Sequence, residues 1–152
     1  MKIKNLIIIL FLILTFSCGY QPIFSSKDIK FSIGQIEVDG DEKLNRIILK
    51  DLQNYQKKSN STNLYNLKIT TKKNKFISSK DTKGNPKTFR IEVINELSVL
   101  TNNKVTANKI FKESQNYNNK SSKFELNEFE EKTLNNLIEK ISENIIIFLQ
   151  SL

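Results

Sequence analysis

The segment FRIEVINELSVLTNNKVTANKIF (residues 89–111) decides the fold class, because its pattern encodes two long strands joined by a turn. In its first half, apolar side chains occupy all odd positions except Asn95, and polar side chains occupy most of the even positions. This period of two is typical of a strand with one buried face. The pair Asn102-Asn103 indicates a hairpin turn, since asparagine tolerates positive φ.

The apolar pattern of this hairpin distinguishes two possible registers. A two-residue loop at 102–103 places Val99 opposite Thr106 and mixes an apolar face with a polar one. A three-residue loop at 101–103 places Val99 opposite Val105 and keeps the apolar side chains together. Because cross-strand partners share a face, we predict the three-residue loop. The predicted inward-facing side chains are Val93, Leu97, Val99, Val105, Ala107 and Phe111.

Two further strands are indicated upstream of the hairpin. Alternation predicts one strand over Phe31–Val38 and another that begins near Tyr65 and can run on to Phe76. The second strand is separated from the hairpin by a turn signal at Gly84-Asn85-Pro86. These strands and the hairpin together give a sheet of four strands.

Two helices are indicated by apolar stripes with helical spacing. The first runs from Leu44 to Tyr55, and Asp39 is its candidate N-cap. The second runs from Leu126 to the end of the sequence, and Ser122 is its candidate N-cap. A membrane-surface helix is the alternative for the second. Its polar face is rich in Glu and poor in Lys, however, whereas surface-binding helices usually carry Lys and Arg there.

The element order is strand, helix, strand, strand, strand, helix. Two one-sided helices and a one-sided sheet bury each other most simply as a two-layer sandwich. We therefore predict a single α+β domain over residues 31–152. Its four-stranded, mainly antiparallel sheet would carry both helices on one face and expose a polar opposite face.

The composition argues against most kinds of enzyme. The 152 residues include no His and only one Cys, which removes the commonest general base, the commonest metal ligand and every imidazole-based triad. The sequence has no Gly-rich phosphate loop, metal-ligand cluster or paired-acid motif. We expect a protein that is not an enzyme and has no metal and no cofactor. An exported hydrolase that uses carboxylates is the remaining enzymatic alternative.

The N-terminal residues have the pattern of an export signal. A basic start precedes the apolar run 6–14, which is too short to cross a bilayer as a helix, since that needs about 20 residues. Small residues on both sides of Cys18 are typical of a bacterial lipoprotein, whose cysteine is acylated after cleavage. We predict a signal peptide over 1–17, lipidation of Cys18 and a tether over 18–30. The alternatives are an ordinary signal peptide or a buried cysteine.

The chain is basic, with 24 Lys and Arg residues against 16 Asp and Glu residues and a formal net charge of +8. Such a surface suits an anionic partner: nucleic acid, phospholipid or phosphorylated glycolipid. Export argues against nucleic acid. Cations around the predicted Gly84 turn form a candidate site for glycolipid phosphates, and a solvated lysine-rich loop is the alternative. These cations are Lys72, Lys73, Lys75, Lys80, Lys83, Lys87 and Arg90.

The heptapeptide CGYQPIF (residues 18–24) resembles the mature N-terminus of the LptE family, the lipopolysaccharide-assembly lipoproteins of Gram-negative outer membranes. The predicted element order is similar to that family's two-layer fold. The resemblance implies a non-enzymatic lipoprotein on the periplasmic face of the outer membrane, anchored through Cys18. Its implied partners are the β-barrel LptD, which it would assist and plug, and lipopolysaccharide.

The membrane and the partner are open to one alternative, an auxiliary lipoprotein of a lipid-transport ABC system. Gly19 stands in place of the Asp that commonly retains lipoproteins at the inner membrane, which favours the outer membrane. Barrel interiors are polar, so the polar turns around Gly84 and Asn102 are the expected contacts with a barrel.

Overall fold

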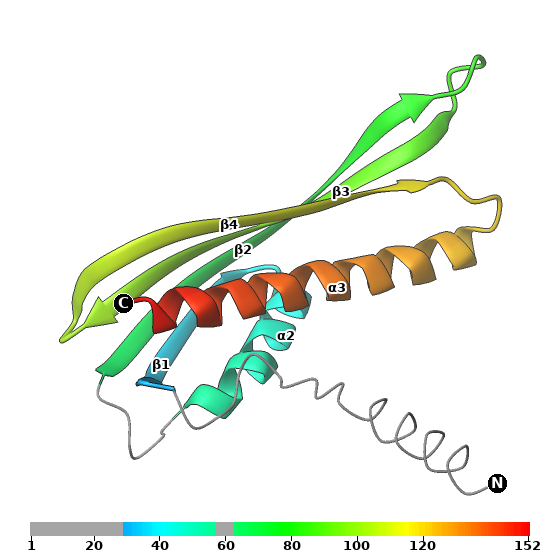
Figure 1. Ribbon diagram of the computed structural model, residues 1–152. Helices are drawn as coiled ribbons and strands as arrows, with labels where there is room; N and C mark the ends of the chain where they lie inside the picture. The colour runs from blue at the N-terminus through cyan, green and yellow to red at the C-terminus, as the bar shows by residue number, and fades with distance from the viewer. Residues whose placement is uncertain (1–28, 57–62) are drawn as a thin grey trace, which may run out of the picture.

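The computed structural model describes residues 29–56 and 63–152 (Figure 1). The predicted signal peptide, Cys18 and the heptapeptide at 18–24 lie outside the described residues. The described elements are β1 (Phe31–Gly40), α2 (Glu42–Leu52), the short 3-10 turn η1 (Gln53–Tyr55), β2 (Asn63–Lys80), β3 (Pro86–Thr101), β4 (Lys104–Asn118) and α3 (Lys123–Gln150).

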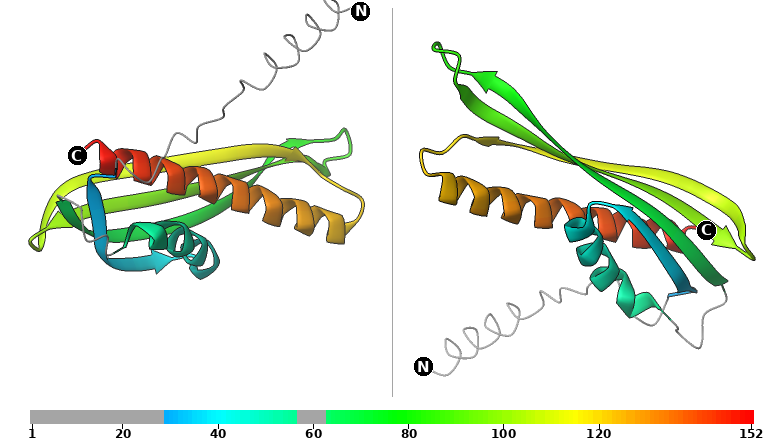
Figure 2. Two further views of the ribbon diagram at one scale, coloured as in Figure 1. Left: turned by 60° about the horizontal axis from the view of Figure 1, so that its bottom comes forward. Right: turned by 180° about the vertical axis from the view of Figure 1, so that it is seen from behind.

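The four strands form one sheet in the order β1-β2-β3-β4, in which β1 is parallel to β2 and the other neighbours are antiparallel. Helices α2 and α3 lie on the same side of this sheet, and the other side is open (Figure 2). The predicted α+β sandwich and its element order are therefore confirmed. None of the helices in the described part of the chain is long and apolar enough to cross a membrane.

A single apolar core lies between the sheet and the helices. Ile33 of β1, Ile48 of α2, Ile69 of β2, Val93 of β3 and Ile138 of α3 are all fully buried there. Burying a side chain of this size stabilises a fold by roughly 1.5–3 kcal/mol. The elements that contribute these side chains are thus held together mainly by the core.

Gly40 sets the junction between β1 and α2. It adopts φ +92°, and a Cβ atom there would lie 2.1 Å from the Thr71 carbonyl oxygen. The chain turns at this glycine, and the Asp41 carboxylate accepts a hydrogen bond of 3.1 Å from the Leu44 amide. Asp41 is therefore the N-cap, and the predicted cap at Asp39 is wrong because β1 extends through Gly40.

The predicted cap of the second helix is correct. The Ser122 hydroxyl accepts a hydrogen bond of 3.4 Å from the Glu125 amide, and α3 begins at the next residue after Ser122. The helix continues to Gln150, so its apolar stripe extends along the sheet from one end of the core to the other (Figure 1).

The β3–β4 turn differs from the predicted three-residue loop. Asn102 and Asn103 have φ values of 51° and 61°, and the flanking Thr101 pairs with Lys104. This is a two-residue turn with both central residues in the left-handed region, which asparagine tolerates. The predicted loop is therefore wrong.

A β-bulge next to this turn explains why the simple register argument failed. The pairing shifts between Val99 and Leu100, so that Val99 lies opposite Ala107 and Thr106 is the extra residue. The bulge lets a two-residue turn coexist with a common apolar face. Four of the predicted inward side chains are buried, and Ala107 is half-buried against the core. Val105 lies before the bulge and is 56% exposed, so its predicted burial is wrong.

The β2–β3 hairpin reaches beyond the layer of helices (Figure 1). Strand β1 pairs with β2 only as far as Thr71, so residues 72–80 of β2 have no strand on that side. The turns around Gly84 and Asn102 lie at opposite ends of the sheet, about 55 Å apart for strands of this length. A contact made with one end of the molecule therefore uses only one of them.

The sheet face opposite the helices is mixed rather than uniformly polar. Lys68, Glu96 and Lys112 lie on it, but so do Ile110, which is 66% exposed, and Phe76, which is 50% exposed. The prediction of an exposed polar face therefore holds for its charged positions and is wrong for its exposed apolar side chains, which also include Leu64 and Val105.

Two isoleucines on neighbouring strands test this assignment of faces. Ile91 is 2% exposed on the helix side of β3, whereas Ile110 is 66% exposed on the opposite face of β4. Ile91→Ala should lower the free energy of unfolding by about 2–5 kcal/mol, because it leaves a cavity in the core. Ile110→Ala should lower it by no more than about 1 kcal/mol. Urea denaturation measures both, and equal losses would contradict the assignment.

Candidate functional site

The turn between β2 and β3 is organised by one carboxylate. Asp81 Oδ1 accepts hydrogen bonds from the backbone amides of Lys83, at 2.9 Å, and Asn85, at 2.8 Å. The amide of Asn85 is the main reason that the pKa of Asp81 is lowered. Gly84, at φ +86°, completes the turn. The turn is therefore a defined structure that holds its lysines away from the rest of the sheet.

Three of the predicted cations lie at this turn. Lys80, Lys83 and Lys87 are exposed, and none of the ion pairs found among the described residues involves them. Lys80 pairs with Pro86 across the hairpin, so Lys80 and Lys87 are close in the register. We call these three lysines and the turn between them the tip.

The lysines on the helix side of β2 are used within the fold. The Lys73 ammonium lies 3.2 Å from the Asp41 carboxylate, and Lys75 forms an ion pair with Glu130 of α3. Lys75 also lies over the Phe89 ring, 4.5 Å from its centroid. These cations fasten the hairpin to both helices, so they are not free to hold an anionic ligand.

The remaining two predicted cations lie on the opposite face of the sheet. Lys72 pairs with Glu96 at 3.0 Å. Arg90 donates a hydrogen bond of 2.9 Å to the Ser114 hydroxyl and lies 3.9 Å from Glu92. The seven predicted cations are therefore divided among the tip and two faces of the sheet, and only the tip brings several unpaired cations together.

Glu92 is the centre of a charged cluster that the sequence analysis did not identify. It is 6% exposed although it lies on the open face, because neighbouring side chains cover it. The Lys112 ammonium lies 2.9 Å away, and this hydrogen bond is the main reason that the pKa of Glu92 is lowered. Asn74 and Arg90 add to the effect, and partial removal from water opposes it. Only the strand register brings these residues together.

Tyr117 joins the base of the hairpin to the start of α3. Its hydroxyl donates a hydrogen bond of 2.7 Å to Glu130, and its ring lies between those of Phe89 and Phe129, at centroid distances of 5.7 and 5.8 Å. Burial, followed by the bond to Glu130, raises the pKa of Tyr117. The same Glu130 carboxylate also pairs with Lys75. The orientation of the tip thus depends on a polar contact and on tilted contacts between aromatic rings.

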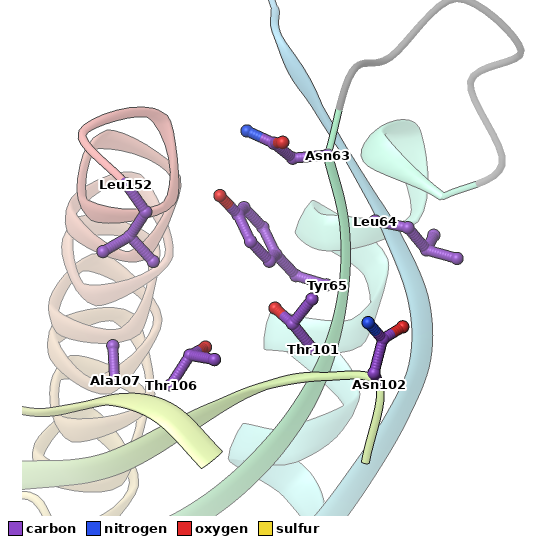
Figure 3. A pocket seen from close by; sticks show the side chains of 8 residues that line it. All are labelled: Asn63, Leu64, Tyr65, Thr101, Asn102, Thr106, Ala107 and Leu152. Atoms are coloured by element: carbon purple, nitrogen blue, oxygen red, sulfur yellow. The ribbon is translucent and has the colours of Figure 1, made fainter. Parts of the chain in front are cut away.

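A pocket of about 510 Å³ lies at the other end of the sheet (Figure 3). The Tyr65 ring and Leu152 line it from the helix side, and Thr101 and Asn102 line it from the β3–β4 turn. Tyr65 and Leu64 point to opposite sides of β2 (Figure 3). Within residues 29–56 and 63–152, no group of three Asp or Glu side chains is placed to hold a metal ion.

The fold is similar to those of several bacterial lipoproteins of known structure. Rare lipoprotein B from Shewanella oneidensis aligns with a TM-score of 0.61 at 14% sequence identity, over 77% of this chain and 94% of that chain. A minor lipoprotein from Acinetobacter baumannii aligns with a TM-score of 0.57 at 14% identity, over 81% of this chain and 92% of that chain.

A third neighbour is an uncharacterized lipoprotein B from Nitrosomonas europaea, with a TM-score of 0.58 at 9% identity. The alignment covers 83% of this chain and 88% of that chain. Neither protein-family models nor curated protein sequences match this chain. At these identities the likeness is one of fold.

The Glu92 cluster predicts a dependence of stability on pH. Since the pKa of Glu92 is lower in the folded chain than in the unfolded chain, its ionised form stabilises the fold above the unfolded value of about 4.3. This contribution is lost as the pH falls through the folded pKa. The free energy of unfolding should therefore fall more steeply below about pH 5 for the wild type than for Glu92→Gln.

The partner of Glu92 provides the matched comparison for this titration. Lys112→Gln removes the strongest cause of the lowered pKa and should also make the acid slope shallower than that of the wild type. Urea denaturation at several pH values measures all three proteins. Identical slopes would show that the Glu92 cluster does not contribute to stability.

Proposed function

We propose that this protein is an outer-membrane lipoprotein that assists lipopolysaccharide assembly as a non-enzymatic scaffold and plug of a β-barrel. The observation that carries the proposal is the likeness of its fold to rare lipoprotein B and a minor lipoprotein over more than three quarters of the chain. The heptapeptide at 18–24 adds support from the sequence, because it lies outside the residues that the structure describes.

The lipid anchor would be attached at Cys18, the only cysteine in the sequence. The domain would then be connected to the membrane by a tether that leads into β1. It would act through the surfaces that it presents on the periplasmic side of the membrane. The fold supports this view because both helices pack on the same face of the sheet. The opposite face and the two ends of the sheet therefore remain available for partners.

The tip is the surface that best suits the lumen of a barrel. It projects beyond the helices (Figure 1), and residues 78–87 contain only polar side chains apart from Gly84 and Pro86. Barrel interiors are polar, so such a tip can enter one without exposing apolar surface to water. Its three unpaired lysines would meet the phosphates of lipopolysaccharide through charge-assisted hydrogen bonds.

Anchoring is tested by Cys18→Ser. Because no other thiol is available, the substitution should abolish fatty-acid labelling and release the domain from membranes into the soluble fraction. Metabolic labelling with a fatty-acid analogue, followed by membrane fractionation, measures both effects. A Cys18→Ser protein that still carries the label would overturn the proposed anchor.

Contact with a barrel is tested by photo-crosslinking. A crosslinker at Asn85 in the tip should capture an outer-membrane β-barrel, whereas one at Glu139, which is exposed on α3, should capture it much less. Mass spectrometry identifies the captured protein. Recovery of inner-membrane transporter subunits from Asn85, with no barrel, would support an auxiliary lipoprotein of a lipid-transport ABC system instead.

Lipopolysaccharide binding is tested by neutralising the tip. Lys80→Gln, Lys83→Gln and Lys87→Gln together should weaken binding of lipid A, and the loss should shrink as salt screens the exposed charges. Lys50, Lys68 and Lys132 form a matched control triple, because they are exposed and lie in none of the ion pairs between described residues. Binding assays with labelled lipid A compare the two triple variants. Equal losses would mean that only net charge matters.

A further inference from the structure

One end of the molecule is assembled from five separate parts of the chain. Phe31, at the start of β1, pairs with Asn63 at the start of β2. Thr101 and Leu152 line the pocket beside Tyr65, which brings the β3–β4 turn and the last turn of α3 to the same place (Figure 3). We call this the tethered end, because residue 30, where the predicted tether ends, lies directly before β1.

The tethered end has a distinctive surface. Leu64, Val105 and Leu152 are 59%, 56% and 50% exposed, and the lysines at positions 30 and 104 are exposed beside them. The described segments that form this end contain no Asp or Glu, although the chain has 16 such residues. These segments are 29–34, 53–56, 63–67, 99–106 and 147–152.

The opposite end differs in charge. Phe124, beside the start of α3, is the most exposed large apolar side chain in the described part of the chain, at 77%. Its surroundings, however, include acidic groups such as Glu125, and Asp81 organises the nearby tip. Apolar side chains are thus exposed at both ends, but only at the tethered end are all the charged side chains beside them cations.

The exposed apolar side chains of the tethered end lie on both sides of the sheet, and Leu64 and Leu152 both line the pocket shown in Figure 3. Leu64 lies on the open side of β2, whereas Leu152 lies on the helix side, next to Tyr65 (Figure 3). Val105 pairs with Leu100 and shares the open face with Leu64. A planar surface that meets the sheet end-on contacts the exposed apolar side chains on both sides of the sheet at once.

We propose that the tethered end is a contact surface for the phospholipid bilayer that holds the acyl chains of Cys18. Leu64, Val105 and Leu152 would enter the headgroup region, and Lys30 and Lys104 would meet anionic headgroups, the combination by which peripheral surfaces bind bilayers. The inference rests on the anchoring through Cys18 proposed above. It concerns the anchored chain before a protein partner is bound.

The length of the tether supports a bilayer as the occupant. Residues 18–30 span at most about 45 Å when fully extended, so an anchor at Cys18 keeps the start of β1 close to the bilayer surface. Tethering of this kind raises the effective concentration of the two surfaces. A weak contact that free protein would not sustain can therefore be occupied most of the time.

The sequence allows a site-specific test, because acylation of Cys18 would leave no free thiol in the full chain. The processed, acylated protein is reconstituted in vesicles of phosphatidylethanolamine and phosphatidylglycerol that contain no other protein. Leu64→Cys, Val105→Cys and Phe124→Cys each accept one fluorophore, and brominated lipids in the vesicles quench a fluorophore that reaches the headgroup region. Quenching at positions 64 and 105 should exceed quenching at position 124 several-fold.

Position 124 is a stringent control, since its native side chain is apolar and more exposed than the other two. Equal quenching at all three positions, or stronger quenching at 124, would overturn the contact surface. Lys30→Gln with Lys104→Gln should reduce quenching at position 105, whereas the same changes at Lys50 and Lys132 should not. Unchanged quenching in the first pair would overturn the role of charge.

Failure of the anchor is recognised separately. A wild-type chain that accepts the thiol label, or whose mass lacks the acyl groups, shows that Cys18 is not lipidated and overturns the proposed anchoring. An acylated chain with uniform quenching leaves the anchor intact and overturns only the contact surface. The two results cannot be confused.

Discussion

The antiparallel pairing of β2 with β3 is the constraint on which the rest of the structure depends. It runs from Asn66 opposite Leu100 to Lys80 opposite Pro86, so it fixes which side chains of both strands face the helices. A slip of one residue would turn the whole apolar set of β3 toward water. Strands β1 and β4 then extend this hairpin on its two sides, and the helices cover only the part that carries apolar side chains.

The periodicity of the sequence correctly predicted most of the side chains that face the core, but it predicted the cross-strand pairing at the β3–β4 turn poorly. The alternation in β3 correctly identified Val93, Leu97 and Val99 as buried, because a period of two follows directly from strand geometry. The predicted three-residue loop at 101–103 was wrong because a bulge at Thr106 places one extra residue in β4. The extra residue shifts the alternation of faces by one, so Val105 lies on the open face although Ala107, two residues later, faces the core.

The candidate site could be predicted only in part for a related reason. Neighbours in sequence on a strand point to opposite faces, so Lys72 and Lys73 belong to different surfaces despite their adjacency. Their partners, Glu96 and Asp41, come from other elements, and only the three-dimensional register reveals that these charges are satisfied. The tip lysines remain without ion-pair partners among the described residues because they lie in a turn that the helices do not reach.

The unpaired side of β2 beyond Thr71 has a consequence for self-association. A long free strand edge is a template on which copies of a protein can join into aggregates. In this chain, residues 72–80 place Lys72, Lys73, Lys75 and Lys80 along that edge. Two copies that approach along this edge would bring these lysines toward one another, which disfavours edge-to-edge pairing. Lys73 and Lys75, which fasten the hairpin to its helices, therefore also protect this edge against pairing with a second copy.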